Sequence, residues 1–151
     1  MISFTRSQSA SRWYRWRLLL VALLPLATSP VLQAQTTILH GAAVYPVFEG
    51  WRPNEDGTIN FIFGYMNENW EEEPHVPVGD HNYFTPGEAD QGQPTKFLPR
   101  RNRFTFEVTV PADWGDKELV WTLNVNGVEA QAFATTQRDY QVDNMIIASE
   151  P

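Results

Sequence analysis

The chain has 151 residues, of which 18 are acidic, 11 are basic and none is cysteine, and its formal net charge is −7. The lack of cysteine excludes disulfides, thiolate metal ligands and cysteine nucleophiles. Coulomb repulsion from so acidic a chain disfavours nucleic acids and anionic membranes as partners.

Residues 1–34 have the layout of a secretory signal peptide. They contain no acidic residue and four basic ones, Arg6, Arg12, Arg15 and Arg17. The apolar run Leu18–Ala27 follows, and the small residue Ala34 offers a cleavage site. A transmembrane anchor is the competing interpretation, but the run falls short of the ~20 apolar residues that span a bilayer. We therefore expect an exported protein, periplasmic or extracellular, without membrane contact after cleavage.

Cleavage after Ala34 leaves a mature chain the size of one ordinary domain. It has 117 residues (151 minus 34), and loss of the four leader arginines leaves seven basic and 18 acidic residues, a net charge of −11. We expect an N-terminal extension at 35–43, a β-sandwich at 44–136 and a tail at 137–151. The apolar triplet Met145–Ile147 makes the tail either a last edge strand or a linker to a further domain.

The first part of the domain predicts a β-hairpin. Strands Val44–Arg52 and Thr58–Asn67 flank residues 54–57 (NEDG), which favour a turn. Parity across that turn places Phe48 on the same face as three aromatic residues of the second strand, Phe61, Phe63 and Tyr65. Apolar residues on the opposite face predict that the second strand is central and covered on both sides.

The last part of the domain predicts a second hairpin. Phe104–Val110 alternates apolar and polar residues as a half-buried strand does, and Leu119–Val125 follows it. Asn126-Gly127 then favours a two-residue turn. Folding the chain there gives four apolar pairs on one face: Val125 with Val128, Leu123 with Ala130, Trp121 with Ala132 and Leu119 with Ala134.

Between the hairpins lies Glu68–Arg101, which is rich in proline, glycine and acidic residues. His75–Gly79 is predicted as a short edge strand, because Pro77 cannot donate to a central ladder. The remainder is predicted to be an ordered loop, since disordered segments are poor in aromatic residues. Four rings are expected to pin it to the domain: Trp70, Tyr83, Phe84 and Phe97.

Short strands with regular turns and no helical period predict an all-β protein. The expected fold is an antiparallel β-sandwich of immunoglobulin-like or fibronectin-like type. Apolar contacts around Trp121 would take the place of the usual disulfide between the sheets.

Two motifs carry a resemblance to a known group. The first lies within Gly79–Pro99 and comprises Asn82, Phe84, Pro86, Gly87, Asp90, Gly92, Gln93, Pro94, Thr95 and Phe97. The second is Leu119–Leu123 (LVWTL). With these motifs, most of the mature domain resembles uncharacterised secreted bacterial β-sandwich proteins. The resemblance implies secretion and a β-sandwich, and it assigns no activity.

An acidic set in the central segment is the candidate metal site. It comprises Glu68, Glu71, Glu72, Glu73, Asp80 and Asp90. Calcium takes six to eight oxygen ligands, and Asn67 and Asn69 could add neutral ones. The alternative is a solvated run of charge, because consecutive glutamates point in divergent directions. The solvated run is the favoured interpretation, so we expect no cofactor, with calcium at this acidic set as the one alternative.

Catalytic chemistry is not expected. His40, His75 and His81 match no metal-binding or general-base spacing. Ser149 is the single serine after residue 34, which excludes a serine triad inside the domain. We therefore predict that the protein is not an enzyme and has no catalytic residue.

Aromatic residues form the candidate ligand-binding set. It comprises Trp51, Trp70, Tyr83, Phe84 and Trp114. Exposed rings can stack on sugars while amides such as Asn54, Asn69, Asn82 and Gln93 address the hydroxyls. The alternative is that the rings anchor loops to the core. We expect a secreted, non-catalytic module that binds a polysaccharide or a cell-envelope protein; a structural spacer domain at the cell envelope is the alternative.

Overall fold

The computed structural model describes residues 37–143 and residue 148. The predicted signal peptide and the triplet Met145–Ile147 lie outside the described residues. The described part is all-β, as predicted, and contains no helix long and apolar enough to cross a membrane.

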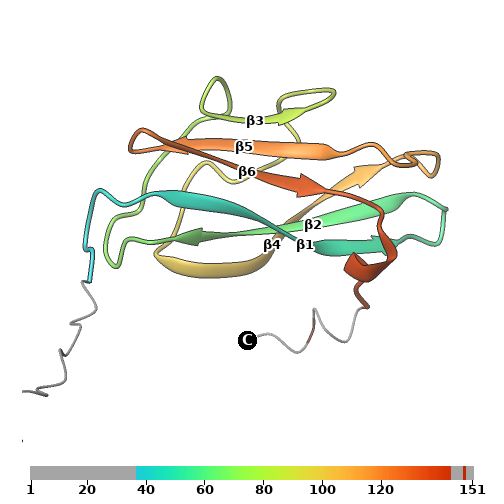
Figure 1. Ribbon diagram of the computed structural model, residues 1–151, viewed down its shortest axis with the longest axis horizontal. Coiled ribbons are helices and arrows are strands. Elements are labelled where there is room, and N and C mark those ends of the chain that lie inside the picture. Colours follow the sequence, from blue (N-terminus) through green and yellow to red (C-terminus); the bar gives the residue numbers. More distant parts are fainter. Residues whose placement is uncertain (1–36, 144–147, 149–151) are drawn as a thin grey trace, which may run out of the picture. The chain divides into compact units, whose positions relative to one another are not determined.

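Two antiparallel three-stranded sheets form the domain (Figure 1). The first has the strand order β1-β2-β4, and its strands are β1 (Val44–Pro53), β2 (Ile59–Asn67) and β4 (Arg100–Val110). The second has the order β3-β5-β6, and its strands are β3 (Asn82–Thr85), β5 (Leu119–Val125) and β6 (Val128–Ala134). A 3-10 helix, η1 (Arg138–Tyr140), follows β6.

The first predicted hairpin is confirmed, with two irregularities. Pro53 pairs with Ile59, so the turn holds the five residues 54–58 and not the four residues 54–57. A bulge between Phe48 and Gly50 then shifts the register again and returns Phe48 to a position opposite Phe63. The backbone of Gly50 has a φ of 138°, which residues other than glycine rarely adopt. As a result, both Phe48 and Trp51 pack against the core.

The second predicted hairpin is confirmed residue by residue. Val125 faces Val128, and the other three predicted pairs follow along β5 and β6. Asn126 and Gly127 have φ values of 53° and 80°, as a turn with two left-handed residues requires. Turn chemistry and side-chain pattern therefore specify the same register.

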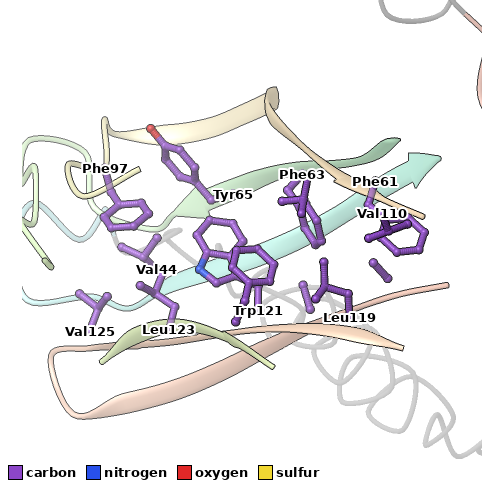
Figure 2. Packing of buried hydrophobic residues seen from close by; sticks show 14 residues of the cluster. Val44, Phe61, Phe63, Tyr65, Phe97, Val110, Leu119, Trp121, Leu123 and Val125 are labelled. Carbon is purple, nitrogen blue, oxygen red and sulfur yellow. The ribbon is translucent and has the colours of Figure 1, made fainter. Parts of the chain in front are cut away.

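The core lies between the two sheets and centres on Trp121 (Figure 2). The Trp121 ring is fully buried and stacks on Phe84 with centroids 5.8 Å apart. Phe106 meets it edge-on at 5.1 Å, and Phe63 does so at 6.0 Å. Phe97 comes from the central segment and lies at 6.4 Å. Aromatic packing thus joins the sheets, as expected.

The start of β4 departs from regular strand geometry. Phe63 faces Phe106 while Tyr65 faces Asn102, so three residues of β4 lie opposite Gly64 alone. Phe104, within this bulge, has a φ of 49°. A side chain at position 64 would collide with the Asn102 carbonyl oxygen and with Glu49. Position 64 therefore requires glycine, because the β4 backbone and the Glu49 side chain approach too closely for a side chain to fit.

Both segments that flank the strands are bonded to the domain. Before β1, the Ile38 carbonyl accepts the Trp70 N–H at 3.0 Å and the Ala43 carbonyl accepts that of Glu68 at 3.1 Å. After η1, the Val142 N–H donates to the Trp51 carbonyl at 2.9 Å, and residue 141 forms a parallel bridge with residue 51. The described parts of the predicted extension and tail thus pack as parts of the fold.

Candidate functional site

The central segment is fastened to the second sheet by one buried amide. The side chain of Asn82 donates to the carbonyls of Val76 (3.0 Å) and Pro94 (2.9 Å). The prediction that His75–Gly79 is an edge strand is wrong, because Pro74 and Pro77 interrupt pairing. Isolated bridges at its two ends replace the strand. The segment is an ordered loop, as predicted, and β3 within it was not predicted.

Beside β3, the same loop forms a hollow of about 370 Å³. Gly79, Asp80, Tyr83 and Ala89 line it. Asp80 is exposed and Tyr83 is half-buried. The position of Tyr83 is fixed by β3, since it pairs with Thr122 of β5 while Phe84 points into the core. The hollow therefore combines a carboxylate and an aromatic ring on a rigid support.

The hollow adjoins the outward side of the second sheet, which we call the Tyr83 face. Alternation along the strands places eight side chains on it: Tyr83, Thr85, Val120, Thr122, Asn124, Glu129, Gln131 and Phe133. Phe133 is 49% exposed and lies opposite Val120. The Gln131 amide donates to the Thr122 hydroxyl at 3.1 Å. The half-buried Tyr83 ring, the exposed Phe133 ring and hydrogen-bonding groups thus share one outward face, within which Thr122 is buried.

The outward side of the first sheet is occupied by ion pairs. Arg52 bonds Glu107 at 2.9 Å. Glu49 bonds Arg101 at 2.5 Å and lies 4.0 Å from Arg103. The Glu49 side chain is only 5% exposed, because these arginines cover it. This face presents internally paired charges, whereas the Tyr83 face presents rings, neutral polar groups and the exposed carboxylate of Glu129.

The five predicted ligand-binding aromatics are not brought together. Phe84 is 1% exposed and stacks on Trp121, so its prediction as a binding residue is wrong: β3 turns its side chain inward. The Trp51 indole donates to the Gln137 carbonyl at 2.8 Å and helps to hold the tail. The Trp114 indole donates to the Lys117 carbonyl at 2.7 Å. The rings of Trp51 and Trp114 therefore anchor the tail and the β4–β5 connection, respectively.

Trp70 and Tyr83 remain accessible. Trp70 is 52% exposed, and the Arg100 guanidinium lies 4.5 Å from its ring centroid. Tyr83 lines the hollow. Phe133, which the sequence reasoning missed, is the second ring of the Tyr83 face. The sequence pattern does indicate its outward position, because Phe133 alternates in register with the polar residues Glu129 and Gln131 of β6.

The amides proposed for sugar binding are engaged within the fold. Asn69, Asn82 and Gln93 are buried, and each is hydrogen-bonded within the domain. Asn54 bonds Thr58 and Asn60 across its own turn. For Asn69, Asn82 and Gln93 the prediction as ligand contacts is wrong, since their amides bond backbone carbonyls inside the domain. For the half-buried Asn54 it stays a prediction.

The six acidic residues predicted for calcium have separate surroundings. Glu72 accepts the Gly41 N–H, and Glu71 lies 3.8 Å from His40. Glu73 pairs with Lys96 at 2.5 Å. Asp90 accepts the Gly92 N–H, Asp80 lines the hollow and Glu68 is exposed. Within 37–143 and 148, no three carboxylate or imidazole groups are arranged to hold a metal ion.

The neutral oxygens proposed for the same metal site are also engaged. The Asn67 side-chain oxygen accepts two hydrogen bonds from Asn69, at 2.8 and 3.0 Å. The Asn69 oxygen accepts the Ala42 N–H at 2.7 Å. Both residues are fully buried, so they hold the N-terminal segment against the end of β2. Calcium binding stays a prediction.

Comparisons of the chain with models of protein families, with curated proteins and with solved structures each found no match.

Proposed function

We propose that this chain is an exported, non-catalytic β-sandwich module that binds a polysaccharide through the Tyr83 face. Export is supported by the signal-peptide layout of residues 1–34. The observation that carries the binding proposal is the placement of the Tyr83 hollow and the exposed Phe133 ring on one outward sheet face.

The fold we propose for this module is immunoglobulin-like. In such domains one sheet contains strands A, B and E, and the other contains C, F and G. Numbered in chain order, these positions correspond to the orders β1-β2-β4 and β3-β5-β6. Trp121, in the middle strand of the second sheet, is the large ring around which the core packs. The strand orders support this finer assignment, whereas the buried tryptophan of immunoglobulin domains lies on strand C and Trp121 lies on the strand that corresponds to F.

The chemistry of the Tyr83 face suits a sugar polymer. Aromatic side chains offer a flat apolar surface together with geometric selectivity, and sugar rings present a matching flat C–H face. Thr85, Gln131 and Asp80 can exchange hydrogen bonds with hydroxyl groups. The sheet holds these groups rigidly, so binding costs little conformational entropy in the protein.

Calorimetric titration of the purified protein with a panel of soluble polysaccharides tests the proposal. We expect that Tyr83→Ala and Phe133→Ala each weaken binding at least tenfold. The matched control is Tyr45→Ala, which removes a ring 38% exposed on β1, in the other sheet. Circular dichroism confirms that the variants fold. If the Tyr83 and Phe133 variants bind as the wild type does, the assignment of this face is wrong.

A structural spacer domain at the cell envelope is the second candidate. It is favoured by the bonding of both flanking segments, with Ile38 joined to Trp70 and Val142 joined to Trp51. Such fastening holds the described chain against the domain from Ile38 to Val142. Under this function no polysaccharide in the panel binds, and limited proteolysis leaves the region from 37 to 142 intact. Binding that depends on Tyr83 would exclude a purely structural role.

A further inference from the structure

We propose that the glycan bound at the Tyr83 face carries free amino groups and is recognised in its protonated, cationic form. This inference rests on the function proposed above and names the class of ligand. It is carried by the distribution of charge around the hollow, since stacking on a tyrosine ring does not by itself distinguish one sugar from another.

The segments that build this surface contain no basic side chain. Strands β3, β5 and β6 and the loop from 79 to 93 hold no lysine or arginine. They hold four carboxylates: Asp80, Glu88, Asp90 and Glu129. His81 is the one group in these segments that gains a positive charge on protonation, and it is exposed. The field over the hollow is therefore negative at neutral pH.

Basic residues are concentrated elsewhere in the domain. Arg52, Arg101 and Arg103 lie on the first sheet, where they are bonded to or near carboxylates. Lys96, in the central segment, pairs with Glu73 at 2.5 Å. None of these residues lines the hollow. An anionic polymer of uronic acids or phosphodiesters would thus meet repulsion at the Tyr83 face, and the segments that build this face offer no lysine or arginine to compensate.

Asp80 is the residue that would bind the protonated amino group of the sugar. It stands in the wall of the hollow together with Tyr83. A sugar stacked on the ring would bring substituents of the pyranose to the carboxylate, where a protonated amine forms a charge-assisted hydrogen bond. Asp80 is exposed, so this contact is expected to change affinity by about three- to fivefold, as a solvated ion pair does.

Three probes of graded charge test the inference in titration calorimetry near pH ~5.5. They are a glucosamine oligosaccharide, its fully N-acetylated counterpart and an oligogalacturonate. We expect the glucosamine oligomer to bind about three- to fivefold more tightly than the acetylated one, and the galacturonate to bind most weakly. Salt near ~0.5 M should remove the preference, because screening weakens exposed ion pairs.

Charge-neutralising variants identify the residue responsible. Asp80→Asn should abolish the preference for the amine, so that the glucosamine oligomer and its acetylated counterpart bind this variant equally. Asp113→Asn makes the same charge change at an exposed site in the β4–β5 connection, away from the hollow, and should retain the preference. Equal binding of the two glucosamine oligomers, tighter binding of the galacturonate, or a preference that persists in Asp80→Asn would overturn the inference and leave polysaccharide binding standing. Failure of all three probes and of the wider panel would overturn the proposed function, and this inference with it.

Discussion

The side-chain oxygen of Asn82 accepts a hydrogen bond from the indole nitrogen of Trp121 at 2.9 Å, and both residues are fully buried. The same amide group donates to two carbonyls of the central segment, at Val76 and Pro94. One asparagine thus satisfies the polar atom of the central core ring and two partly buried carbonyls of the loop. It couples the packing of the core to the order of the loop that carries the Tyr83 hollow.

Replacing Asn82 with alanine should therefore destabilise the whole domain. The change leaves the Trp121 N–H and two carbonyls without partners, and each buried unsatisfied group costs about 1–3 kcal/mol. We expect the free energy of unfolding to fall by about 3 kcal/mol in urea titrations followed by tryptophan fluorescence. Asn124→Ala, half-buried on β5, should stay within about 0.5 kcal/mol of the wild type. A loss below about 1 kcal/mol for Asn82→Ala would show that water replaces the amide.

Gly50 should be intolerant of any side chain because the tail packs directly on it. A Cβ atom there would lie 2.5 Å from the Tyr140 carbonyl oxygen and 2.7 Å from a methyl carbon of Val142. We expect Gly50→Ala to cost about 1–3 kcal/mol and to expose the tail to proteases near residues 137–142. Gly79→Ala is the matched control, since Gly79 has a similar φ of 148° but no atom within 4 Å. Equal losses at both positions would assign the effect to backbone strain and not to the tail.

Tyr65 should make the free energy of unfolding of the domain depend on pH in the alkaline range. Burial raises the pKa of its phenol, while the hydrogen bond from the Leu98 N–H opposes the shift. A raised folded-state pKa contributes stability that is complete below the ordinary value of 10.0 and is lost as pH rises through the folded value. Tyr65→Phe removes the acceptor for Leu98, which costs about 1 kcal/mol at neutral pH. The deficit should shrink in unfolding titrations above pH ~10, and a constant deficit would contradict this account.

Asp56 should stabilise the domain at neutral pH, and this contribution should be lost in acid and not in alkali. Its carboxylate accepts hydrogen bonds from the hydroxyl (2.6 Å) and the N–H (3.0 Å) of Thr58, which lower its pKa below the ordinary 3.8. A lowered folded-state pKa gives stability that is present above the ordinary value and lost as pH falls through the folded value. Asp56→Asn should thus lower the thermal midpoint at neutral pH, and the difference should vanish in strong acid. Glu55→Gln in the same turn controls for loss of one negative charge.

Local patterns predicted the two hairpins and the position of Trp121 well. At Asn126-Gly127, turn chemistry and apolar alternation agree, and every predicted pair is present. For β1 and β2 the predicted face of Phe48 is confirmed for a reason that the pattern does not contain. The five-residue turn would place Phe48 opposite Gly64, and the bulge at Glu49 returns it to Phe63. Two irregularities that cancel leave no trace in side-chain alternation.

The candidate site was less predictable because its residues are chosen by long-range contacts. Buried asparagines resemble surface ones in a sequence, and only the fold shows that Asn69 and Asn82 are consumed by backbone groups. Phe84 and Tyr83 are adjacent, and the register of the unpredicted strand β3 decides which one points outward. Phe133 could not be predicted as a binding residue, because a single apolar residue in an otherwise polar register is common on protein surfaces.

The path of the chain through β1 determines how the domain bears a pulling force (Figure 1). The preceding segment joins β1 at Val44, and the tail runs parallel to β1 and bonds to it at Trp51. The described chain therefore enters at one end of this strand and leaves toward the other, so tension on the two ends acts along the strand axis. The ladder between β1 and β2 and the bridge between residues 51 and 141 lie along this same axis, so a load of this direction acts on both in shear and not by peeling.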